Sequence, residues 1–179
     1  MPEAGRLPAV TLVLGGARSG KSRHAERLVE AARTAASTYI ATAEAGDAEM
    51  AARIADHRAR RGRLWHTVEA PLDLAAAVAA HAAPDRPVLV DCLTLWLSNL
   101  LLAGRVAEHE AEILCGALRR AGGPVVLVAN EVGLGLVPET PLGRRFRDEA
   151  GRLNQRVAAL ADRVVFVAAG LPLMLKGAA

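Results

Sequence analysis

A glycine-rich turn near the N-terminus holds the first residues in this sequence that could do chemistry. Four residues separate Gly15 from Gly20, Lys21 and Ser22, which is the spacing G-x-x-x-x-G-K-[ST]. The glycines let successive backbone N–H groups point at one spot, and the positive end of the following helix strengthens their attraction for an anion. Lys21 would reach the outer phosphates of a nucleotide, and the Ser22 hydroxyl is a Mg²⁺ ligand. We call residues 15–22 the phosphate loop and predict that it binds a nucleoside triphosphate.

The acid at the end of the later apolar run VLVD is a second candidate. Asp91 stands where the second acid of nucleotide-binding α/β folds contacts Mg²⁺, directly or through water. The alternative is that Asp91 caps the helix that follows, because aspartate is a good N-cap residue. We favour the metal role.

Two histidines follow the phosphate loop. His24 lies three residues after Lys21 and could reach a phosphate only from the side, so we expect a partly exposed helix histidine. His57 continues an apolar helix face with Met50 and Ile54, and arginines surround it in the sequence. Neighbouring cations lower the pKa of an imidazole and favour its neutral, nucleophilic form. Spacing alone nevertheless favours a histidine at the edge of the core.

Apolar runs and helical periodicity alternate between these residues. Short β-branched apolar runs predict strands of a parallel sheet, with those at 9–15 and 87–94 buried, and the stretches between the runs predict helices. This alternation is typical of one doubly wound α/β domain, a mostly parallel sheet flanked by helices, over residues 1–179. Strands are predicted at 9–15, 37–43, 87–94, 124–130 and 164–170, an extended crossing at 65–71 and an edge at 172–177; helices are predicted from the phosphate loop to about Arg33, from Asp47, and at 73–81, 94–102, 107–122 and 141–161.

Composition narrows the class of protein. The chain has 179 residues, of which 52% are hydrophobic and 3% aromatic, with a formal net charge of +3. This balance suits a small polyanion, and the scarcity of aromatic side chains for base stacking argues against nucleic acid. Cys92 and Cys115 show no zinc spacing, so both are expected to be reduced core thiols. We expect a cytoplasmic enzyme, because no apolar run is long enough to span a membrane and the N-terminus does not resemble a signal peptide.

Several stretches together resemble one family, the bifunctional adenosylcobinamide kinase and adenosylcobinamide-phosphate guanylyltransferase of cobalamin biosynthesis. The resemblance covers nearly the whole chain, and GGARSGKSRHAE combined with NEVGLGLVPE and GRLNQ is far more selective than a phosphate loop alone. The stretches that carry it are GGARSGKSRHAE, YIATAEA, DAEMAARIADHR, WHTVEAP, VDCLTLWLSNLL and NEVGLGLVPETPLGRRFRDEAGRLNQR.

The resemblance implies a RecA-like P-loop NTPase fold, a homotrimer and two reactions on one corrinoid. In the first, ATP or GTP phosphorylates the aminopropanol hydroxyl of adenosylcobinamide. In the second, GTP gives GMP to the resulting phosphate, with Mg²⁺ as cofactor, and yields adenosylcobinamide-GDP. Two other hypotheses remain open: that the protein is a P-loop small-molecule kinase without guanylyl transfer, or that it is a RecA-like ATPase that acts on nucleic acid or a protein partner.

The same resemblance implies roles for individual residues. It makes His57, in the segment RIADH, the carrier of GMP, which reverses the expectation from spacing, and it makes Lys21 catalytic. Glu69 could accept from guanine N1–H and N2–H₂ together. Metal binding falls to Ser22 and Asp91. The nucleotide neighbours are Gly15, Gly16, Ala17, Arg18, Ser19, Gly20, Lys21, Ser22, Arg23, Ala41, Thr42, Ala43, Arg58, Ala59, Arg60, Arg61, Glu69 and Asp91.

Glu131 and the arginines of the last long helix each allow two interpretations. Glu131 is either a catalytic or Mg²⁺-ordering acid or a cap for the turn at Gly133. The arginines of the last long helix either contact phosphates or face solvent, and we favour solvent for most. These arginines are Arg144, Arg145, Arg152 and Arg156.

Overall fold

A seven-stranded sheet forms the centre of the molecule. The computed structural model describes residues 7–32, 36–44, 62 and 64–177. The strand order is β3-β2-β4-β5-β1-β6-β7; the first six of these are parallel and β7 is antiparallel to β6. The strands are β1 (Val10–Gly15), β2 (Ser37–Ala41), β3 (Trp65–Glu69), β4 (Val88–Asp91), β5 (Val125–Asn130), β6 (Arg163–Ala168) and β7 (Leu171–Lys176); the helices are α1 (Lys21–Ala32), α3 (Leu74–His81), α4 (Leu93–Leu102), α5 (Ala107–Arg119) and α6 (Pro141–Leu160).

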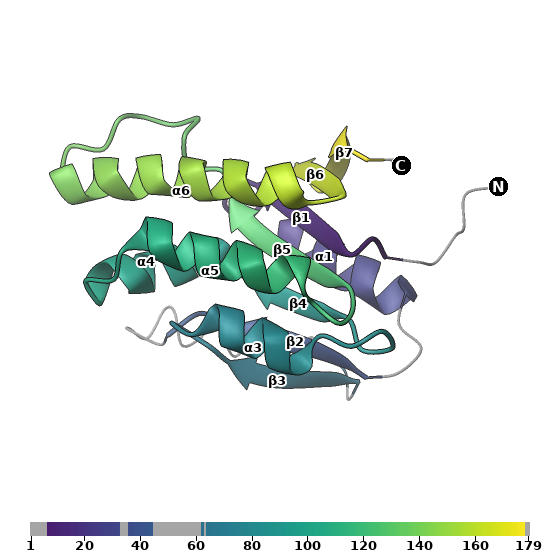
Figure 1. Ribbon diagram of the computed structural model, residues 1–179. Helices are drawn as coiled ribbons and strands as arrows, with labels where there is room; N and C mark the ends of the chain where they lie inside the picture. The colour runs from purple at the N-terminus through teal and green to yellow at the C-terminus, as the bar shows by residue number, and fades with distance from the viewer. Residues whose placement is uncertain (1–6, 33–35, 45–61, 63, 178–179) are drawn as a thin grey trace.

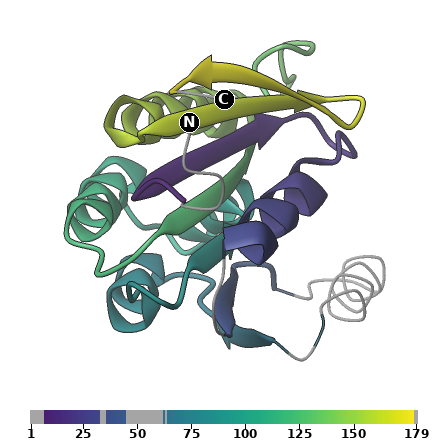
Figure 2. The same cartoon turned by 90° about the vertical axis from the view of Figure 1, so that its right-hand side faces the viewer.

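Helices cover both faces of the sheet (Figures 1 and 2). α3, α4, α5 and α6 lie on one face, and α1 lies on the other. Successive β1 residues alternate between the two cores, since Leu12 and Leu14 pack in the cluster on the four-helix face while Val13 packs with α1. Both faces of β1 are therefore apolar, which explains why its sequence is a continuous apolar run rather than an alternating one.

The elements largely follow the pattern expected from the sequence. The five predicted strands are present as β1, β2, β4, β5 and β6, and 172–177 supplies most of the antiparallel edge strand β7. Residues 65–69, expected only as an extended crossing, form a true edge strand that pairs in parallel with β2. The helix predicted from Asp47 lies outside the described residues.

Both cysteines lie in the interior of the protein, as expected from the sequence. Cys92 and Cys115 are buried, free thiols, and burial raises the pKa of Cys92 to about 11. The Cys92 thiol therefore stays protonated near neutral pH. Within the described part of the chain, no helix combines the length and the apolar character that a membrane span requires.

Candidate functional site

The phosphate loop connects the end of β1 to the start of α1. Two residues adopt a positive φ that bends the backbone into a cradle, Arg18 at 56° and Gly20 at 93°. The Ser19 N–H donates to the Gly16 carbonyl at 3.3 Å, and the Lys21 ammonium donates to the same carbonyl at 3.1 Å. Lys21 is only 9% exposed, because its side chain folds back over the phosphate loop.

Close packing behind the loop requires glycine. A Cβ on Gly15 would lie 2.5 Å from the Val167 carbonyl oxygen and 2.5 Å from the Ser19 hydroxyl. The Ser19 carbonyl accepts from the Gly170 N–H at 2.8 Å, so the turn between β6 and β7 supports the loop from behind. A Cβ on Gly20 would meet the Gly170 Cα at 3.3 Å. The backbone thus comes too close at these points for a side chain to fit without a shift.

Asp91 lies at the same edge of the sheet, where the carboxyl ends of the parallel strands meet. The Tyr39 hydroxyl donates to Asp91 Oδ2 at 2.9 Å, and the buried Tyr39 ring packs edge-on against Trp65 at 5.9 Å between centroids. Burial lowers the pKa of Lys21, while nearby Cys92 and Asp91 act in the opposite direction. Asp91 is therefore oriented by a buried phenol and close enough to Lys21 to affect its charge. The residue at the N-cap of α4 is Cys92, one position after the residue that the capping alternative named.

Thr42 ties the end of β2 to the end of β4. Its hydroxyl donates to the Cys92 carbonyl at 2.7 Å and accepts from the Cys92 N–H at 2.8 Å, and the residue is fully buried. The Asn99 amide donates to the Thr42 carbonyl at 2.8 Å and to the Pro71 carbonyl at 3.1 Å. The Thr42 hydroxyl therefore serves to fix the position of the peptide that follows Asp91.

The sheet register brings three of the expected nucleotide neighbours side by side. Ala41 pairs with Glu69 on β3 and with Asp91 on β4. Glu69 is exposed at this edge. Its strand, β3, is four strand spacings from β1, a separation of about 19 Å. Ala43 follows β2 at the same edge and is half-buried. Five expected residues lie outside the described chain: His57, Arg58, Ala59, Arg60 and Arg61.

Glu131 caps a turn. Its carboxylate accepts from the Gly133 N–H at 2.6 Å, as the second interpretation of this residue predicts. The Glu131 N–H donates to the Gly15 carbonyl at 3.1 Å, so the segment after β5 starts directly beside the phosphate loop.

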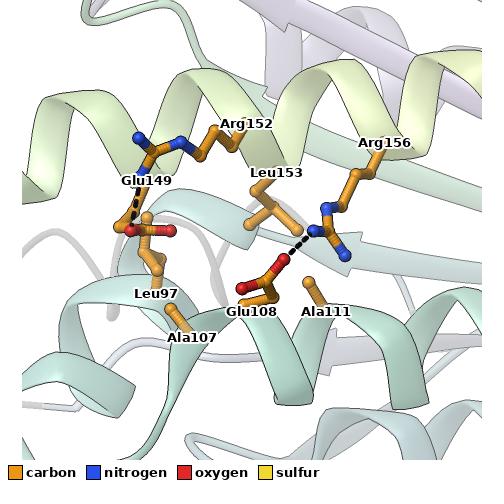
Figure 3. A pocket seen from close by; sticks show the side chains of 8 residues that line it. All are labelled: Leu97, Ala107, Glu108, Ala111, Glu149, Arg152, Leu153 and Arg156. Atoms are coloured by element: carbon orange, nitrogen blue, oxygen red, sulfur yellow. Dashed lines mark hydrogen bonds and ion pairs between the residues drawn. The ribbon is translucent and has the colours of Figure 1, made fainter.

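The arginines of α6 are largely occupied within the protein (Figure 3). Arg152 pairs with Glu149 at 2.8 Å, and Arg156 pairs with Glu108 and, at 3.5 Å, with Glu112 on α5. The Arg152–Glu149 and Arg156–Glu108 pairs line a cavity of about 100 Å³ between α5 and α6. Arg144 donates to two carbonyls of the preceding loop, and Arg145 is exposed. Arg144, Arg145 and Arg152 are exposed, in agreement with the interpretation that most of these arginines face solvent, whereas Arg156 is held by two carboxylates of α5.

Sequence reasoning missed several polar residues that shape the site. Thr94 accepts from the Asn130 N–H at 2.7 Å, and Asn154 donates to the Asn130 carbonyl at 3.2 Å; both side chains are 7% exposed. These two contacts fix the end of β5. Asn99 was overlooked in the same way. An amide within the apolar run LTLWLSNLLL was the available signal, because a buried polar side chain needs hydrogen-bond partners.

The comparison with a family model decides what kind of protein carries this site. Residues 11–175 match the model described as cobinamide kinase / cobinamide phosphate guanyltransferase. The chain belongs to this family. It is 55% identical to the bifunctional adenosylcobalamin biosynthesis protein CobP of Pseudomonas aeruginosa, over 93% of this chain and 96% of the relative. It is 45% identical to the protein CobU of Salmonella typhimurium, described in the same words, over 92% and 98%.

Solved structures of similar shape support the fold. The ATPase EscN of an enteropathogenic Escherichia coli type III secretion system matches with a TM-score of 0.57 at 12% identity, over 90% of this chain and 43% of that one. At this identity the likeness shows the fold alone. The domain has the RecA-like P-loop fold that the family resemblance implied.

Proposed function

We propose that this protein carries out both reactions of its family. It phosphorylates the aminopropanol hydroxyl of adenosylcobinamide with ATP or GTP, and then transfers GMP from GTP to that phosphate to give adenosylcobinamide-GDP. One observation carries the proposal: a phosphate loop with a buried lysine lies at the same sheet edge as an oriented acid, in a member of this family.

The first reaction would use the phosphate loop to position the triphosphate. The loop N–H groups and Lys21 stabilise the charge that develops as the γ-phosphoryl group passes to the corrinoid hydroxyl. The Ser22 hydroxyl and the Asp91 carboxylate are hard oxygen donors of the kind Mg²⁺ prefers. When bound there, Mg²⁺ would neutralise the phosphate oxygens.

The second reaction would proceed through His57. Its imidazole attacks the α-phosphorus of GTP, a P–N bond forms, and pyrophosphate leaves. The corrinoid phosphate then attacks the same phosphorus and the P–N bond breaks, which frees the histidine. Dividing one displacement into two in this way is covalent catalysis. Glu69, exposed at the sheet edge, would recognise the guanine in this step.

The family resemblance further supports a homotrimer that works in the cytoplasm. Sedimentation of the purified protein would test the trimer directly. A monomer at micromolar concentration would contradict it.

Labelled nucleotide tests the proposed chemistry. With GTP labelled at the α-phosphate, we expect a protein-bound label that survives alkali and is lost in acid. His57→Ala should abolish the label and keep kinase activity, whereas Lys21→Ala should damage both reactions. His109→Ala on α5, an exposed histidine away from the sheet edge, is the matched control and should label normally. Wild-type protein that phosphorylates adenosylcobinamide but never acquires the label would reduce the proposal to a kinase.

A further inference from the structure

Exposed apolar side chains stand on the segment that joins β5 to α6. Leu134 is 82% exposed, Leu136 is 96% exposed and Val137 is 63% exposed. Polar contacts hold the segment at both ends: the Gly133 N–H is bound by the Glu131 carboxylate, and the carbonyls before α6 accept from Arg144. An ordered loop therefore presents these side chains to solvent, although burial of each leucine would be favourable.

A groove continues this surface between α4 and α6. Its lining includes Leu101, Leu102, Leu142 and Phe146, around a cavity of about 290 Å³. Leu102 is 76% exposed and Leu142 is 54% exposed. In Figure 1 the loop between β5 and α6 rises above the start of α6, and α4 ends beneath that same part of the helix. We call the set Leu102, Leu134, Leu136, Val137 and Leu142 the apolar platform.

The platform begins beside the phosphate loop and extends away from it. The Glu131 N–H is 3.1 Å from the Gly15 carbonyl, and Leu134 is three residues further, within about 11 Å of Glu131 by chain length. On α6, Asn154 contacts the end of β5, and Leu142 lies twelve residues earlier, about 18 Å along the helix. A ligand that touches both the platform and a phosphate in the loop must therefore be large.

We propose that the apolar platform binds the corrin ring of the substrate while the phosphate loop engages the hydroxyl arm. This inference rests on the proposed function, and it assigns the body of the substrate to named residues. A corrin is a broad ring with methyl groups and amide side chains on its rim, and its aminopropanol hydroxyl ends one of those side chains. A nucleotide bound at the loop supplies no comparable apolar surface. The platform thus fits the corrinoid and leaves the nucleotide to the loop.

Direct binding of adenosylcobinamide tests this assignment, because the corrinoid absorbs visible light and its bound fraction can be measured by equilibrium dialysis. Leu134→Ser and Leu136→Ser should each weaken corrinoid binding about tenfold if the leucine is buried by the ligand. ATP binding should not change. The matched control combines Leu173→Ser with Leu175→Ser on the edge strand β7, which carries no residue of the apolar platform. Leu173 is 60% exposed and Leu175 is 55% exposed. Leu102→Ser with Leu142→Ser tests the groove independently of the loop.

The outcomes separate this inference from the proposed function. Wild-type protein that binds no adenosylcobinamide would refute both. Wild-type binding that persists unchanged in the loop and groove variants would refute the platform alone. Unchanged corrinoid binding together with a smaller oligomer in the loop variants would also refute it, because the surface would then be a contact between copies of the chain. Weakened corrinoid binding, with ATP binding and oligomeric state retained, would support it.

Discussion

Adjacent glycines in the phosphate loop, Gly15 and Gly16, should respond differently to substitution by alanine. In Gly15→Ala the new Cβ would lie 2.5 Å from the Val167 carbonyl oxygen, which is about 0.9 Å inside the ordinary contact limit of 3.4 Å. A backbone oxygen in a paired strand cannot rotate away, so overpacking should cost about 3 kcal/mol. The smaller entropy of the unfolded alanine chain returns about 0.5 kcal/mol. We expect a net loss of about 2.5 kcal/mol in the free energy of unfolding.

Gly16→Ala is the matched control. No atom lies within 4 Å of its new Cβ, and its φ is outside the left-handed region. This variant should be unchanged or gain up to about 1 kcal/mol. Urea unfolding followed by circular dichroism measures both, and the Gly15→Ala midpoint should fall by about 1 M. Equal midpoints for the two variants would refute the close packing of the loop against β6.

Three further predictions concern the sheet edge. Thr42→Val keeps the shape of the side chain but leaves the buried Cys92 N–H without its partner, so the free energy of unfolding should fall by about 2 kcal/mol in urea titrations; Thr42→Ser should fall less, and equal losses would contradict this assignment. Tyr39→Phe removes the hydrogen bond to the Asp91 carboxylate and should raise the Mg²⁺ concentration for half-maximal kinase activity about tenfold; an unchanged Mg²⁺ dependence would show that the phenol does not position the acid. Burial lowers the pKa of Lys21, so in the nucleotide-free protein the Lys21 ammonium loses its proton below pH 10.5, and nucleotide affinity measured by calorimetry should fall as the pH rises through that lowered pKa. The nucleotide affinity of the Lys21→Arg variant should stay constant over the same pH range. An equal decline in the two proteins would assign the titration to another group.

Sequence patterns gave the order of the elements because buried parallel strands leave continuous apolar runs. VTLVLG and VVLVAN are predicted as strands for this reason, and both lie in the interior of the sheet. WHTVE was harder to place, because an edge strand with one covered side carries mixed residues. Its pairing with β2 depends on a neighbour distant in sequence and could not be read locally.

The candidate site was only partly predictable. The phosphate loop follows from local spacing, since eight consecutive residues carry the whole motif. The Tyr39 hydroxyl and Asp91 are 52 residues apart in the chain, and Thr42 and Cys92 are 50 apart, so only the β2–β4 pairing brings them together. The turn cap by Glu131 could be predicted from the sequence, because its partner Gly133 is only two residues away in the chain.

The contact between Ser19 and Gly170 joins two segments that are 151 residues apart in the chain. On a ribosome, residues 15–22 emerge long before the β6–β7 turn that supports them, and at ordinary rates of synthesis the delay is roughly 7–30 s. During that interval the nascent chain has the motif without its supporting turn. Capacity to hold a triphosphate should consequently arise late in translation, when the C-terminal hairpin closes, and protein truncated before Gly170 should lack it.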